Sequence, residues 1–313
     1  MNVIIQRLFK FLLVIISVSL ITFLMVDRLP GDMTYKIAGP GATPEEIREL
    51  QQELGLDRNV MHRYLSWLSR VSQGDLGISA VTGENVAAAI ISRLPVTLEL
   101  LLISQMIALA LAIPCGIISA YKAHSRIDRV IGSIAFGFMS IPIFILAIVF
   151  IYLFALKLEW LPATGYIPLS DGFWGNIQSL LLPSLSIALV EWVSLTRVLR
   201  SDMIATLKED FILLVRAKGI SDYRILLNHA LKPSSFTLIT ILGIQIGHLI
   251  SGAVIVETIF SLPGLGRLLV EAIYGRDVLM IQGCILFVTC AYVTINFTVD
   301  LLYSIFDPRI RVG

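Results

Sequence analysis

The sequence predicts an all-α membrane protein that crosses the bilayer six times. Of its 313 residues, 56% are hydrophobic and only 15% are charged, and the mean hydropathy is +0.84. A soluble globule of this size needs more charged residues on its surface, so the composition favours a polytopic membrane protein. The second observation is a set of long uncharged runs. A hydrocarbon core of about 30 Å is crossed by roughly 20 helical residues, so each run is a candidate span.

Six runs meet this requirement. They cover residues 11–26, 100–121, 130–156, 172–196, 234–256 and 278–299. The first run is short and follows two basic residues, as in a signal peptide, but "MVDRLPGD" lacks a small-residue cleavage site. We therefore expect an uncleaved anchor. Pro114, Pro142 and Pro183 lie inside spans and are expected to kink them, because neighbouring helices can satisfy the backbone groups that a proline frees.

The basic residues predict the orientation. Fourteen lie in segments that would share one side of the membrane: Arg7, Lys10, Lys122, Arg126, Arg129, Arg197, Arg200, Lys208, Arg216, Lys218, Arg224, Lys232, Arg309 and Arg311. The two short loops on the other side hold three, namely Lys157, Arg267 and Arg276. Short cytoplasmic loops carry the excess of lysine and arginine, so both termini are predicted to be cytoplasmic.

The outer segment between the first two spans is predicted to be structured. Thr43 and Glu46 have the spacing of a capping box, which starts a helix that Gly55 ends. A second amphipathic helix ends before Gly74, and its apolar residues are Val60, Tyr64, Trp67, Leu68 and Val71. The apolar faces need a surface, which could be the spans, the lipid interface or a docked protein. We expect residues 1–96 to form the first span plus this segment, and 97–313 to form a five-helix core.

The long cytoplasmic loop, residues 197–232, contains "EDFILLVRAKGISDYRILLNHALKP". Its pattern predicts a short helix, a bend at Gly219 and Ser221, and a second short helix that Pro233 ends. Five apolar residues in a row, 211–215, would be a liability on a solvated helix. Either they pack under the spans of their own chain, or they form a knob that enters a cleft on a cytoplasmic partner.

The last outer loop, "ETIFSLPGLGRLLVEAI", is too short and interrupted to cross the membrane. Pro263, Gly264 and Gly266 predict a turn, and a short amphipathic helix near the outer face follows it.

Three polar residues inside spans are candidates for the transport path. Glu191 is the one charge deep in a span, and a carboxylate there is costly unless it faces a cavity or a partner. It lies either on a substrate path or subunit contact, or at the interface near a basic residue. Gln245 and His248 share a face of the fifth span with Gly252, where helix packing or path lining would explain them.

Several chemistries have no support in the sequence. The remaining histidines lie on both sides of the membrane, and Cys115, Cys284 and Cys290 fall inside spans as small core residues. No G-x-x-x-x-G-K-[ST], H-E-x-x-H or G-x-S-x-G motif occurs, so ATP would be bound by another chain and we expect no enzyme activity. We expect no cofactor, no metal site and no nucleic-acid partner. A gated channel is the rival class.

A set of motifs spread along the chain resembles a known family. They are "RLPGD" at 28–32, "LGLD" at 54–57, "GDLGIS" at 74–79, "TLEL" at 97–100, "VRAKG" at 215–219, "ETIFSLPGLGRLL" at 257–269 and "DPRIR" at 307–311. Together they resemble permease subunits of binding-protein-dependent ABC importers, specifically the first permease of the branch that serves dipeptides, oligopeptides, glutathione and nickel. The chain departs from the family at 213–215, where Leu-Leu-Val replaces Glu-Ala-Ala, and at Met33 and Leu262.

The resemblance implies a type I ABC importer permease in a bacterial inner membrane. Its partners would be a second homologous permease, two cytoplasmic ATPases, an extracytoplasmic solute-binding protein and membrane lipid. The solute would be a di- or oligopeptide, with nickel, a metal chelate or glutathione as the alternative. The residues implied to couple to the ATPases are Asp210, Phe211, Leu214, Val215, Arg216, Ala217, Lys218 and Gly219.

Overall fold

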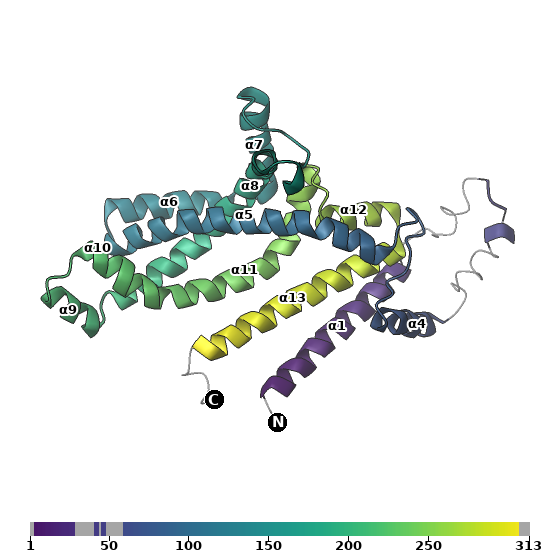
Figure 1. The fold of residues 1–313 in the computed structure, drawn as a ribbon, viewed down its shortest axis with the longest axis horizontal. Coiled ribbons are helices and arrows are strands. Elements are labelled where there is room, and N and C mark those ends of the chain that lie inside the picture. The colour runs from purple at the N-terminus through teal and green to yellow at the C-terminus, as the bar shows by residue number, and fades with distance from the viewer. Residues whose placement is uncertain (1–2, 29–40, 44, 48–58, 307–313) are drawn as a thin grey trace. The chain divides into compact units, whose positions relative to one another are not determined.

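The computed structural model describes residues 3–28, 41–43, 45–47 and 59–306, and for 3–8, 27, 246–251 and 300–306 it describes the backbone only. Within these residues the regular structure is helical, apart from one isolated antiparallel bridge between Ile78 and Asn85 (Figure 1). The all-α prediction is therefore confirmed.

Five stretches of helix in the described chain are long and apolar enough to cross a membrane. They are α1 (Val3–Asp27), α5 (Val86–Tyr121), α8 (Phe173–Thr206), the helix that continues from Asp222 into α11 (Leu231–Ile259), and α13 (Val278–Phe306). α5 begins well before the predicted span at 100, and α8 continues ten residues beyond the predicted end of the fourth span at 196.

The third predicted span, residues 130–156, is broken rather than kinked. α6 (Arg126–Ser140) and the segment formed by α7 (Ile143–Phe150) and the π-helix η1 (Ile151–Lys157) meet at 96°. Ile141, at the break, is extended with φ −95° and ψ 121°, because the ring of Pro142 disfavours helical geometry in the residue before it. The expectation of one kinked helix over 130–156 is thus wrong in shape, and the count reaches six when the bent pair is taken as one span.

The chain folds into two compact units, and residues 98–262 with 295–313 make up one of them. Its core consists of small and aliphatic side chains from α5, α6, α8 and the cytoplasmic loop, including Ala108, Ala188, Leu199 and Ile212. Gly116 permits the close approach of α5 to α8, because a Cβ at this position would lie 2.9 Å from Cδ2 of Leu199. This unit contains the cytoplasmic loop.

Residues 1–97 and 263–294 make up the other unit. Here α4 (Val60–Ser72) packs on α1: the rings of Tyr64 and Trp67 lie 5.5 and 6.0 Å from the ring of Phe23, and the hydroxyls of Ser19 and Tyr64 are 2.9 Å apart. Three surfaces were proposed for the apolar face of the second amphipathic helix, and the structure shows that it packs against a span, α1.

Two further predictions for this unit are confirmed. Thr43 and Glu46 form the capping box, in which the Thr43 N–H donates to the Glu46 carboxylate at 2.8 Å and the Glu46 N–H donates to Oγ1 of Thr43 at 3.3 Å. The predicted end of that helix at Gly55 lies outside the described residues. The last outer loop forms a turn followed by the short helix α12 (Leu265–Gly275), whose first N–H donates to Oγ1 of Thr97.

Candidate functional site

The predicted cytoplasmic loop, residues 197–232, is built from helices with a bend between them. After α8 ends at Thr206, a three-residue turn leads into α9 (Asp210–Ala217), and a second turn through Gly219 leads into α10 (Asp222–Arg224). The predicted first short helix and the bend are confirmed. The first ten residues assigned to the loop instead belong to α8, because Leu199 and Met203 continue its buried face.

The two faces of α9 have different surroundings. Ile212 is fully buried, and Val215 packs against the same core. Phe211, Leu213 and Leu214 are 42%, 56% and 65% exposed. The apolar run is therefore divided by the helical period: one face packs on its own chain, as the first alternative expected, and the other is exposed. The partner contact of the second alternative stays a prediction.

The other residues predicted to couple to the ATPases lie at the ends of α9 and are exposed. Asp210 is the first helical residue, where a carboxylate interacts favourably with the helix dipole, and Arg216 is in the last turn. Ala217 ends the helix and Lys218 is its C-cap. Gly219 has φ +77°, so the bend has the left-handed backbone that favours glycine.

The second predicted short helix is longer than expected. α10 passes into the π-helix η3 (Ile225–Ala230) and then into α11, so Pro233 lies inside a helix instead of ending it. Proline has no N–H to bond the carbonyl of residue 229, and that carbonyl lies in the widened π turn, where the ordinary i to i−4 ladder is already replaced. Ser221 is the N-cap of α10 by position, but its side chain makes no capping bond.

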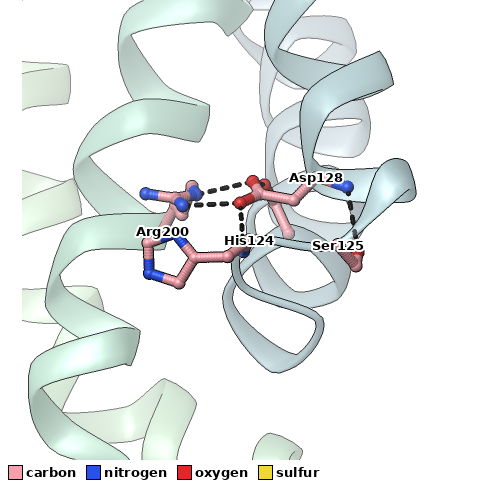
Figure 2. Close-up of polar contacts among 5 residues, drawn as sticks. His124, Ser125, Asp128 and Arg200 are labelled. Carbon is pink, nitrogen blue, oxygen red and sulfur yellow. Dashed lines mark hydrogen bonds and ion pairs between the residues drawn. The ribbon is translucent and has the colours of Figure 1, made fainter.

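An ion pair fastens the turn between α5 and α6 to α8 (Figure 2). Arg200 donates to both carboxylate oxygens of Asp128, from Nε at 2.8 Å and from Nη2 at 2.7 Å. Asp128 also accepts the N–H of His124 at 2.8 Å and the hydroxyl of Ser119. Each carboxylate oxygen thus has two donors, which is the arrangement that a shielded charge requires.

A second polar contact leaves the same turn. The hydroxyl of Tyr121, at the end of α5, donates to Oδ2 of Asp222 at 2.8 Å, and Nε of Arg216 lies 3.8 Å from Oδ1 of Asp222. Sequence reasoning missed both contacts. The capping-box spacing of Ser125 and Asp128 signals the start of α6, which Ser125 does cap, but it does not signal these contacts.

The path candidates are brought together only in part. Glu191 is half-buried in α8, and its carboxylate has no partner within the described residues. One turn further on, Ser194 accepts a hydrogen bond from Nε2 of Gln245 on α11. Gln245 therefore contacts α8 three residues after Glu191, and a shared role of the two side chains stays a prediction. The His248 side chain lies outside the described part of the chain.

A polar cluster bonds the loop between η1 and α8 to both α5 and α8. Glu99 of α5 accepts hydrogen bonds from Tyr166 at 2.9 Å and from Asn176 at 2.8 Å. Burial, together with the hydrogen bond to Glu99, raises the pKa of Tyr166 to about 12. The phenol therefore remains a donor throughout the neutral pH range. Among the described residues, no group of three or more histidine, cysteine or acidic side chains could hold a metal.

The fold defines the class of protein. The chain superimposes on a subunit of the MetNI methionine ABC transporter in an inward-facing conformation with a TM-score of 0.58, over 70% of this chain and 96% of that one, at 16% identity. A second crystal form of the same transporter superimposes with a TM-score of 0.57. This likeness shows a type I ABC importer permease fold.

The family follows from closer relatives. The family model "Binding-protein-dependent transport system inner membrane component" matches residues 112–312, and a model for the N-terminal part of such components matches 1–101. The chain belongs to this family of multi-pass inner-membrane permeases. It is 40% identical to a putative peptide transport system permease of Brucella abortus over 98% of both chains, and 36% identical to the glutathione transport system permease GsiC of Escherichia coli over 99% of both.

Proposed function

We propose that the chain is one permease subunit of an ATP-driven importer for di- and oligopeptides and peptide-like solutes. The observation that carries this proposal is the division of α9, which is anchored by Ile212 and presents three apolar side chains outward. A relative from Brucella abortus named as a peptide permease, similar over nearly the whole chain, supports the solute class.

α9 and the bend after it form the contact with the ATPases. An exposed apolar surface on a helix that is fixed to its own core suits a dry cleft on a soluble protein. The chain has no phosphate-binding loop, so the ATPases supply the hydrolysis and this chain catalyses no reaction. The excess of basic residues on one side supports a cytoplasmic location for the loop and both termini.

In this proposal residues 97–313 are the permease core and residues 1–96 an anchor with an outer segment. A second, homologous permease completes the pathway, two ATPases bind the cytoplasmic side, and a solute-binding protein delivers solute from outside. Glu191, Gln245 and His248 line the path. The similarity to GsiC favours glutathione as a second candidate solute, and glutathione is itself a modified tripeptide.

The test is transport by the complete complex in proteoliposomes. With its ATPases and binding protein, the permease should import labelled peptide only when ATP is present. The substitution Leu214→Asp should reduce co-purification of the ATPases, because an unpaired charge in a dry cleft costs several kcal/mol. Leu214→Met keeps an apolar side chain of similar length and should behave as wild type.

Two results would contradict the proposal. Normal assembly and uptake with Leu214→Asp would show that the exposed face of α9 contacts no ATPase. Ion flux through the two permeases reconstituted without ATPases would show a channel instead.

A further inference from the structure

The turn between α5 and α6 is bonded to both helical arms that flank α9. On one side, Asp128 holds Arg200 of α8, the arm that precedes α9. On the other, Tyr121 holds Asp222, the first residue of the arm that follows α9. All four residues belong to one compact unit.

The attachment to α8 is the more rigid of the two. The two parallel bonds from the Arg200 guanidinium fix its orientation as well as its distance, and Asp128 is itself held by Ser119 and by the backbone of His124. His124 has φ +65°, a left-handed backbone conformation, in the short turn between Tyr121 and Arg126. A displacement of α8 at Arg200 therefore moves the turn with it.

The attachment to α10 is a single hydrogen bond between exposed groups. The nearby pair of Arg216 and Asp222 is 3.8 Å apart and solvated, and such pairs contribute little. Within the described residues, the Tyr121 hydroxyl provides the polar link between α5 and the second arm. The arms also touch directly, since the hydroxyls of Thr206 and Ser234 lie 3.1 Å apart.

We propose that the α5–α6 turn is a brace: Tyr121 and Asp128 are positioning residues that keep the two arms of α9 in register, so that displacement of α9 moves α8 and α11 together. This inference rests on the proposed contact of α9 with the ATPases. The alternative is a structural tie that serves only the stability of the fold.

The critical variant is Tyr121→Phe, which removes one hydroxyl and keeps the ring. The complete complex in proteoliposomes is assayed for ATP hydrolysed per labelled peptide imported, for co-purification of the ATPases and for thermal stability. We expect unchanged co-purification and a rise of about threefold or more in ATP per peptide, because a hydrogen bond to a carboxylate contributes at least this factor to an equilibrium.

Three further variants sharpen the test. Asp222→Asn should raise ATP per peptide as well, and the double variant should add little to Tyr121→Phe, since both changes weaken one bond. Asp128→Asn weakens the other attachment and should also raise the ratio. Tyr223→Phe is the matched control, because Tyr223 is 73% exposed, adjoins Asp222 and makes no bond in the described chain.

The brace is refuted if ATP per peptide stays at the wild-type value in Tyr121→Phe and Asp222→Asn, or if it changes only in proportion to lost stability or lost ATPase binding. Leu214→Asp separates the two proposals. If Leu214→Asp lowers co-purification of the ATPases and Tyr121→Phe leaves ATP per peptide unchanged, only the brace is wrong. If neither has an effect, the proposed role of α9 is wrong too.

Discussion

Substitution of Gly219 tests whether the bend after α9 transmits motion. The glycine has φ +77°, and no atom lies within 4 Å of the position that a Cβ would occupy. A Cβ at this position therefore meets no neighbour, and backbone strain is the cost that the structure assigns to Gly219→Val. An L-residue in the left-handed region costs about 1–2 kcal/mol, and a β-branched one is at the upper end of this range. The observed bend should then lose roughly 5- to 30-fold in population relative to other backbone geometries.

The expected phenotype is uncoupling without loss of assembly. α9 keeps its anchor, since Ile212 remains buried in the core, and its exposed face is unchanged. The ATPases should therefore bind, while the altered bend passes their movement less faithfully to α11. The measurement counts ATP hydrolysed and peptide imported in the same proteoliposomes, and the ratio should rise in Gly219→Val.

Gly219→Asn provides the control, because asparagine tolerates the left-handed region far better than valine. It should keep a ratio near that of the wild type. The reasoning is refuted if Gly219→Val couples normally, or if Gly219→Asn uncouples as strongly as Gly219→Val, since strain would then not be the cause.

Three other substitutions have defined outcomes. Glu191→Gln should lower uptake or change solute preference with assembly intact, and equal uptake of every solute tested would remove this carboxylate from the path. Gly116→Val should destabilise the protein by about 1–3 kcal/mol through overpacking, because its Cβ would lie 2.9 Å from the buried Leu199; an unchanged thermal midpoint would contradict this. Tyr166→Phe should lower the thermal midpoint by removing the bond to Glu99. The Tyr166 pKa is raised to about 12, so its contribution is complete below pH of about 10 and lost between about pH 10 and 12. A midpoint that does not differ between Tyr166→Phe and wild type at pH 7 would refute this assignment.

The parts of the fold that depend on local pattern were predictable. Long apolar runs identify spans because the hydrocarbon core sets a minimum length. The capping box at Thr43 and the positive φ of Gly219 follow from bonds and backbone preferences within a few residues. These signals can be read without knowing which helices contact one another.

The proline effects were only half predictable. Pro142 and Pro233 both lie in helical segments, yet the first breaks its helix by 96° and the second stays inside α11. A π-helix at residues 225–230 precedes Pro233, whereas the residue before Pro142 is extended. The local sequence around the two prolines does not show which outcome occurs.

The polar contacts of the candidate site could not be predicted because they join distant residues. Asp128 and Arg200 are 72 positions apart, and Tyr121 and Asp222 are 101 apart. The sequence around each of these four residues does not identify the residue it bonds. For α9, the pattern showed that the apolar run would be unfavourable if fully exposed to water. It did not show which side of the helix faces the core, because that depends on how α8 leads into the loop.

One face of α9 is limited by packing in its own core and the other face is not, and this difference affects how related transporters can diverge in sequence. Changes at Ile212 disturb the permease's own core, whereas Phe211, Leu213 and Leu214 contribute little to it. If α9 contacts the ATPases as proposed, a duplicated permease can acquire a different ATPase through these three outward positions while its inward ones stay fixed. Exchange of these three side chains between paralogues is expected to transfer partner choice without rebuilding the membrane domain.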